Sequence, residues 1–127
     1  MDVLGMIYNA LIANEYILSQ AKGRIKYYEY PESKDVKNPF IIIDPLDVPS
    51  PKDFADNTWL SNDCLLQIDV WTKNRTTTKE LAENVQKVMW NIGFRQNGGI
   101  EEWDKDTGIF RDARRYRGKI YRDDLDI

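Results

Sequence analysis

The sequence predicts an α+β fold: a mixed or mainly antiparallel sheet of about four to six strands, with two helices packed on one face. Three observations support this prediction: a strand followed by a helix within 64–94, an isoleucine-rich segment at 40–44, and a helical period near the N-terminus. The chain has 127 residues, which is the usual size of one domain, so 1–127 is expected to fold as a single domain.

The segment 64–71 alternates between two kinds of side chain, as a strand with one face in the core does. The apolar face carries Cys64, Leu66, Ile68 and Val70, and the mixed face carries Leu65, Gln67, Asp69 and Trp71. Thr77 lies three residues before Glu80, which is the spacing of a capping box, so the next helix is expected to begin near Thr78. Apolar residues then recur every three or four positions as far as Gly93, which is expected to end the helix.

The N-terminal half supplies three further elements. Asp2 can cap a first helix, whose apolar stripe continues to about Ala21–Gly23. A strand is expected at Arg24–Tyr30, closed by Pro31, because the segment is rich in residues that favour strands. Phe40–Asp44 contains three consecutive isoleucines, which favours a central strand covered on both faces.

The segment 45–60 shows neither a helical nor a strand period. It contains three prolines, Pro45, Pro49 and Pro51, together with several acidic residues. We predict a long loop here, and because long loops inside compact folds are often functional, this one is a candidate assembly arm.

Beyond Gly93 the sequence predicts strands at 94–96, 100–103 and 109–121, with a turn at Asp104–Gly108. Asp104, Asp106 and Gly108 partly match a calcium-binding loop, but the position of its bidentate glutamate is occupied by Arg115. A plain hairpin turn explains the same residues better.

Composition excludes several classes of function. The chain has no histidine, which removes the most frequent general base and metal ligand, and no glycine-rich phosphate loop. Its one cysteine, Cys64, excludes a multi-cysteine zinc site and is expected to be a small buried hydrophobe. No catalytic, cofactor or metal site is therefore predicted, and we expect a soluble non-enzyme without a membrane span or signal peptide. Catalysis by a pair of carboxylates stays open, although no pair stands out.

Basic residues concentrate near the C-terminus, where the segment 106–122 contains six basic residues and only two acidic ones. Three interpretations are open: a solvated edge strand, a surface between subunits, or a nucleic-acid site in which Tyr116 and Tyr121 stack on bases. For the surface between subunits, acidic partners are available near Asp53 and Asp56 and in the tail 123–126. Trp71 is the first choice among the four tryptophans for a partial contact. The candidate interface residues are Asp53, Asp56, Trp71, Arg111, Arg114, Arg115 and Arg117.

The order of elements adds a resemblance that spans nearly the whole chain. The resemblance rests on a leading helix, an isoleucine-rich strand, Leu66–Trp71, the helix ending in Gly93-Phe94-Arg95, and the segments Asp106–Phe110 and Arg114–Arg117. In these features the chain resembles the small tail-terminator or head–tail joining proteins of long-tailed bacteriophages and prophages. Members often carry histidine in the last hairpin, where this chain has Arg111 or Asp112.

The resemblance implies a structural role. Such proteins form rings, commonly hexamers, that end the tail tube and dock it to the head connector. It implies a homo-oligomer with the tail tube protein and the head connector protein as partners, located in the tail or neck of the virion after assembly in the host cytoplasm. The alternative from the residues alone is a nucleic-acid-binding accessory protein that uses the basic C-terminal hairpin, although the net charge of −3 gives no general attraction to nucleic acid.

Overall fold

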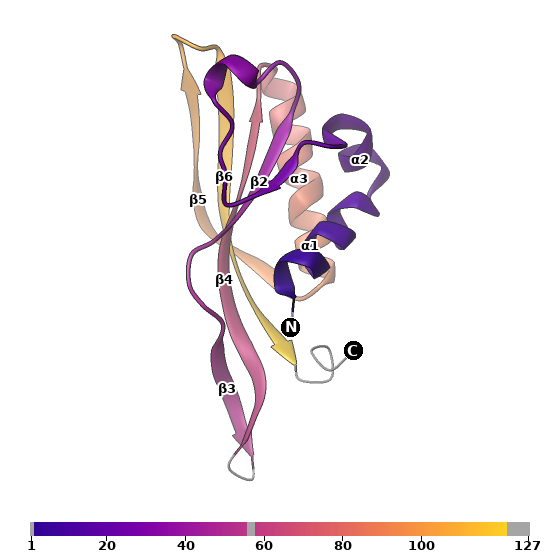
Figure 1. Ribbon diagram of the computed structural model, residues 1–127, viewed down its shortest axis with the longest axis vertical. Helices are drawn as coiled ribbons and strands as arrows, with labels where there is room; N and C mark the ends of the chain where they lie inside the picture. The colour runs from indigo at the N-terminus through magenta and orange to yellow at the C-terminus, as the bar shows by residue number, and fades with distance from the viewer. Residues whose placement is uncertain (1, 56–57, 122–127) are drawn as a thin grey trace.

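The computed structural model describes residues 2–55 and 58–121, which form one twisted sheet with helices on one side (Figure 1). The sheet has six strands, and its main order is β1-β2-β4-β6-β5, with β3 also paired to β4. All strand pairs are antiparallel except β1 with β2. The predicted α+β fold with a mixed sheet is therefore confirmed.

The helical layer contains one helix more than predicted, because the first expected helix is divided in two. α1 spans Val3–Ile12 and α2 spans Glu15–Ala21. Asn14 causes the division: its side chain accepts a hydrogen bond from the backbone N–H of Ile17 and so caps a second helix. The apolar stripe still continues through both helices, since Ile7, Leu11, Ile17 and Ala21 are all fully buried.

The long helix α3 spans Arg75–Asn91, so it begins three residues before the predicted start. Its N-cap is Asn74, whose side chain accepts a hydrogen bond of 2.9 Å from the backbone N–H of Thr77. The predicted capping box at Thr77 and Glu80 is therefore wrong: Asn74 satisfies the free donor first, and the Glu80 side chain binds the Tyr16 hydroxyl instead. Gly93 follows the helix with a φ of +94°, as expected of a helix stop.

A cap substitution tests this assignment. Replacing Asn74 with alanine is expected to lower the free energy of unfolding by about 1 kcal/mol, because an orphan N–H at the start of α3 loses its acceptor. Thr77→Ala is the matched control and is expected to cost less, because the Thr77 backbone N–H, not its hydroxyl, makes the cap. Urea unfolding of both variants measures the difference, and a larger loss for Thr77→Ala would restore the capping box.

The strands follow the predicted pattern in the centre of the sheet. β1 spans Ile25–Tyr27, β2 spans Phe40–Pro45, and β4 spans Thr58–Thr72, which is much longer than the predicted 64–71. The predicted core face of β4 is confirmed, because Cys64, Leu66, Ile68 and Val70 are each at most 3% exposed. These side chains pack with the helices into one cluster that also includes Leu81, Val85 and Met89 of α3.

The segment predicted as a long loop at 45–60 is mostly strand. β3 spans Ser50–Ala55 and pairs with 58–63 of β4. β2 and β3 are antiparallel to successive parts of β4, joined by a connector at 46–49. The sequence pattern did not predict this strand, because its prolines lie at or beside strand ends. In addition, Asp53 has a φ of +55°, which interrupts the alternation of side chains along β3. We call β3 with residues 58–63 the arm, which extends away from the helices (Figure 1).

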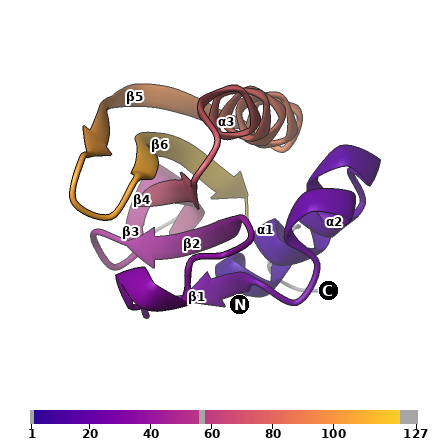
Figure 2. The same cartoon turned by 90° about the horizontal axis from the view of Figure 1, so that it is seen from above.

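The C-terminal strands form the predicted hairpin. β5 spans Phe94–Asp104 and β6 spans Ile109–Tyr121, and the turn closes with a hydrogen bond from the Gly108 N–H to the Asp104 carbonyl. A register shift between Gln96 and Gly99 separates the two short strands that the sequence predicted. The interpretation of the basic strand as a sheet edge is wrong, because β6 lies between β4 and β5. The two edges of the main sheet are β1 and β5, which lie on opposite sides of the molecule (Figure 2).

Candidate assembly surface

The sheet has a second face, opposite the helices, which we call the open face. The strand registers place alternate residues of β2, β4 and β6 side by side on it. Its side chains are Phe40, Ile42 and Asp44 from β2; Leu65, Gln67, Asp69 and Trp71 from β4; and Arg111, Ala113, Arg115, Arg117 and Lys119 from β6. The mixed strand face that the sequence predicted for 64–71 is part of this surface.

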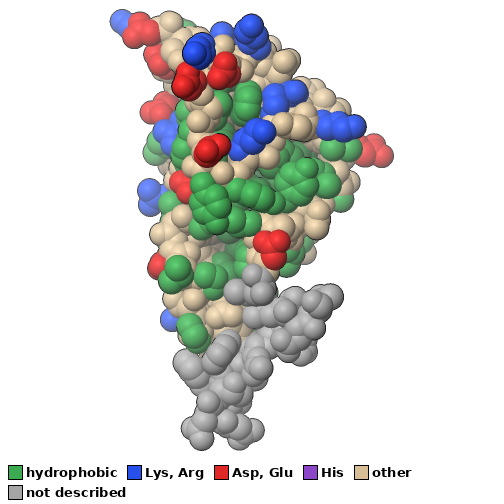
Figure 3. All heavy atoms as spheres, in the orientation of Figure 1, with side chains coloured by type: hydrophobic (Ala, Val, Ile, Leu, Met, Phe, Trp, Pro, Cys, Tyr) green, Lys and Arg blue, Asp and Glu red, His purple; other side chains and the backbone are tan. Residues whose placement is uncertain are grey.

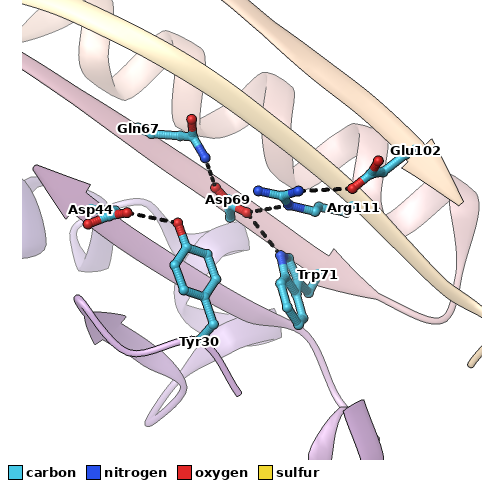
Figure 4. A network of polar contacts seen from close by, with 7 residues as sticks. All are labelled: Tyr30, Asp44, Gln67, Asp69, Trp71, Glu102 and Arg111. Atoms are coloured by element: carbon cyan, nitrogen blue, oxygen red, sulfur yellow. Dashed lines mark hydrogen bonds and ion pairs between the residues drawn. The ribbon is translucent and has the colours of Figure 1, made fainter. Parts of the chain in front are cut away.

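A polar network centred on Asp69 organises the open face (Figure 4). Asp69 is 0% exposed, and its carboxylate accepts three hydrogen bonds. The donors are the Gln67 amide at 2.8 Å, the Trp71 indole N–H at 3.1 Å and the Arg111 Nε at 2.6 Å. A buried carboxylate needs such a set of donors, because burial without partners costs several kcal/mol.

Arg111 continues the network towards the sheet edge. Its Nη1 donates to the Glu102 side chain of β5 at 2.9 Å, so one guanidinium bridges two carboxylates on two strands. Burial opposes its charge, but the hydrogen bonds to Asp69 and Glu102 raise the pKa of Arg111 above its ordinary value. The group is therefore a fixed cation that ties β4, β5 and β6 together.

Part of the open face is covered by the chain itself. The segment 28–39 follows β1 and lies over the sheet, with the Tyr30 ring 5.7 Å from the Trp71 ring and the Tyr30 hydroxyl donating to Asp44. Burial, together with the nearby charge of Asp69 and the bond to Asp44, raises the pKa of Tyr30 to about 12. Trp71 is consequently half-buried, and the ring that it touches belongs to its own chain, so a contact of Trp71 with another subunit stays a prediction.

The basic stripe of the sequence is divided between two faces, because neighbouring residues of a strand point to opposite sides. Arg111, Arg115 and Arg117 lie on the open face, with Arg115 and Arg117 exposed. Arg114 lies on the helix side, where it binds Asp112 and the Gln86 side chain of α3. Burial raises the pKa of Asp112, which the bonds from Arg114 partly offset.

Two ion pairs connect β6 to the arm. Arg117 binds Asp63 at 2.6 Å, and Lys119 binds Asp53 at 2.9 Å, while Ser61 also donates to Asp53. The bonds from Lys119 and Ser61 hold the pKa of Asp53 below its ordinary value. Asp53 was predicted as an acidic partner for the basic stripe at a surface between subunits, whereas the structure pairs it with Lys119 of the same chain. Asp56 and the acidic tail 123–126 lie outside the described residues.

Hollows lie along the open face, and two of them are lined by large apolar side chains. The larger, of about 720 Å³, lies between the start of α1 and the connector 46–49, and its rim includes the exposed Tyr28, Leu46 and Val48. The smaller, of about 520 Å³, is lined by Trp71, Trp103 and Arg111. Figure 3 shows hydrophobic side chains gathered in the middle of the visible face. The sequence interpretation missed Tyr28, Leu46 and Val48, whose only signal was their apolar character beside prolines and turns.

The tryptophans divide into different environments. Trp90 on α3 is 62% exposed, with the Arg95 guanidinium 5.4 Å from its ring centre. Trp103 on β5 is 57% exposed and stacks on Phe110. Large exposed aromatic side chains are favoured anchors at protein interfaces, so Trp103, and Trp90 on the helical side of the sheet, are candidate contacts beyond the residues chosen from the sequence.

Among residues 2–55 and 58–121, no group of three or more acidic or cysteine side chains is arranged to hold a metal ion. In the predicted turn, the Asp104 carboxylate accepts a hydrogen bond from the Asp106 N–H, as in an ordinary Asp turn. No helix in the described part of the chain is long and apolar enough to cross a membrane.

Comparison with known proteins gives a structural relation and no sequence relation. No protein-family model and no curated protein matches the sequence. The fold is similar to that of a chain in the structure described as "Virion of native gene transfer agent (GTA) particle", with a TM-score of 0.63 over 91% of this chain and 91% of that chain. The two chains are 13% identical, so the likeness concerns the fold.

Proposed function

We propose that the protein is a structural component of a phage-type virion, which ends the tail tube and joins the tail to the head as an oligomeric ring. The observation that carries the proposal is the fold, which is shared over 91% of both chains with a component of a gene transfer agent virion. The sequence resemblance to tail-terminator and head–tail joining proteins supports the same assignment from independent features. The proposed location is the tail or neck of the virion, after assembly in the host cytoplasm.

The surface supports a docking role rather than a catalytic one. The larger of the two hollows described above is apolar at its rim, and exposed aromatic side chains lie on α3 and β5. The arm is a strand pair that stands out from the helical layer, which suits contact with a neighbour. In this proposal the partners are further copies of the chain, commonly six, the tail tube protein and the head connector protein. The chain itself acts as one structural domain and not as an enzyme.

The nucleic-acid alternative loses weight because the basic side chains of β6 are neutralised within the chain. Arg111, Arg114, Arg117 and Lys119 bind carboxylates at 2.6–3.0 Å. Arg115 is the remaining basic residue of β6 and belongs to no ion pair among the described residues. Binding of phosphates would have to break these internal pairs, so the arginines are better suited to hold the sheet together.

The test of the ring is direct. Purified protein is added to tail tubes that lack a terminator, and annular caps are counted by electron microscopy, with the mass of the assembly measured by light scattering. We expect capped tubes of uniform length that then accept heads. Tubes that stay open at every protein concentration would contradict the proposed function.

A second measurement separates protein docking from nucleic-acid binding. We expect the wild-type protein to bind duplex DNA weakly. The contribution of β6 to the negative slope of log affinity against log salt should have a magnitude of no more than about 1, because a single basic residue of β6 is available for phosphate. Arg115→Ala should remove most of that slope. Submicromolar binding with a slope of several units would favour the nucleic-acid alternative.

A further inference from the structure

The two edges of the main sheet have no strand partner in the described part of the chain, and they differ in charge. Opposite charges would allow one edge to bind the other edge of a neighbouring copy in the proposed ring. An inference about such a contact therefore rests on the proposed function. β1 and β5 lie on opposite sides of the molecule (Figure 2), which is the arrangement that a head-to-tail contact requires.

The β5 edge is acidic at its far end. Every residue of β5 after Phe94 is exposed, and the segment 100–106 carries four acidic residues against Lys105. Glu102 is paired with Arg111, whereas Glu101, Asp104 and Asp106 form no ion pair with the described residues. Ile100 and Trp103, 54% and 57% exposed, add apolar surface among these carboxylates.

The β1 edge is basic. Lys26 in β1 and Lys22 at the end of α2 are exposed and form no ion pair among the described residues, and the exposed Glu29 is the one acidic residue between 22 and 30. Tyr28, directly after β1, is 63% exposed and has a φ of +66°. An aromatic residue in this left-handed region is strained by about 1 kcal/mol or more, and such strain collects at functional positions.

We propose that the acidic β5 edge of one copy docks on the basic β1 edge of the next, with Trp103 of one meeting Tyr28 of the other. The partner of each edge is a second copy of the chain, because the two edges complement each other. Both present exposed apolar surface, surrounded by acidic residues on β5 and by basic residues on β1. Two β5 edges repel, and so do two β1 edges, which disfavours symmetric pairs. A contact between two different surfaces, repeated around an axis, closes into a ring.

Charge reversal tests the contact. One variant carries Lys22→Glu and Lys26→Glu, which makes both edges acidic; the other carries Glu101→Lys and Asp106→Lys, which makes both basic. Each variant alone is expected to require at least a tenfold higher concentration to associate, measured by sedimentation velocity. An equimolar mixture is expected to associate like the wild type, because every contact then joins opposite charges, and only even-numbered assemblies can close.

A matched control carries Lys79→Glu and Lys87→Glu on exposed positions of α3, with the same change in net charge as the first variant. We expect it to associate like the wild type. Recovery in the mixture also shows that both reversed variants are folded.

Three results would overturn edge docking: wild-type protein that stays monomeric in concentrated solution, reversed variants that associate normally, or a mixture that does not recover. In each case the proposed function is judged separately by the capping of tail tubes. If the protein caps tubes and the charge-reversed variants associate normally, the proposed function stands and the proposed interface is wrong.

Discussion

Replacing Asp69 with alanine is expected to destabilise the protein by about 3 kcal/mol or more, because the substitution leaves a guanidinium, an indole N–H and an amide without their common acceptor. Asp69 is fully buried and the Arg111 side chain is 26% exposed, so water can replace the lost carboxylate only in part. Urea unfolding measures the change in the free energy of unfolding, and circular dichroism verifies the starting fold.

Two companion variants identify the cause of that loss. Asp69→Asn keeps one carbonyl oxygen for the Arg111 and Trp71 donors, so we expect it to cost less than Asp69→Ala. Arg111→Met removes the cation but keeps most of the apolar stem. If the two charges act as a pair, the double variant Asp69→Ala/Arg111→Met costs clearly less than the sum of the single ones. A loss below about 1 kcal/mol for Asp69→Ala would show that the network does not stabilise the sheet.

Gly118→Ala is expected to cost about 2 kcal/mol, because there is no room for a methyl group at this position of β6. A Cβ there would lie 2.7 Å from the Phe94 ring and 2.8 Å from the Gly93 carbonyl oxygen. Phe94 is 1% exposed and follows the turn after α3, so the ring cannot move out without opening the core. Denaturant unfolding of the variant measures the loss.

The double variant Gly118→Ala/Phe94→Leu tests the steric explanation. Leucine is smaller than the phenylalanine ring, so the added methyl group gains space. The double variant should therefore be more stable than the sum of the two single losses predicts. If the two single losses in the free energy of unfolding add strictly, the clash of the added methyl group is with the Gly93 carbonyl oxygen and not with the Phe94 ring.

The two positions would affect the proposed assembly as well as stability. The Asp69 network holds three strands in register beneath Arg111 and Glu102, and Gly118 lets the chain that follows α3 lie against β6. Both hold β5 and β6 in place: the network joins them to β4, and Gly118 allows the close approach of Gly93 and Phe94 to β6. If the edges of the sheet join neighbouring copies, this rigidity sets the angle between them and therefore whether a ring closes.

Local patterns predicted a substantial part of the fold. The alternation at 64–71 correctly identified the core face of β4, and the three-and-four spacing identified the buried stripe of α3, because both signals depend only on neighbouring residues. The hairpin turn at Asp104–Gly108 was predicted for the same reason. The division at Asn14 and the cap at Asn74 were missed, although each is a local signal that a more careful search for N-caps would have found.

The candidate surface was predicted less completely. The sequence analysis chose Trp71 and Arg111, which lie in one network. It also chose Arg115 and Arg117, which lie with them on the open face. It grouped Arg114 with them, although strand alternation alone places Arg114 on the other side. It did not single out Asp69, because nothing in the local sequence distinguishes a buried carboxylate from an exposed one.

By itself, then, the sequence determined the α+β class, the amphipathic elements and the hairpin, since periodicity and turn chemistry are properties of consecutive residues. Only the tertiary structure decided that β6 is internal, that the proline-containing segment pairs with β4 as the arm, and that opposite charges lie on the two edges of the sheet. These features depend on which strands pair across long separations in the chain. Such pairing is chosen by the packing of the whole core and not by any one segment.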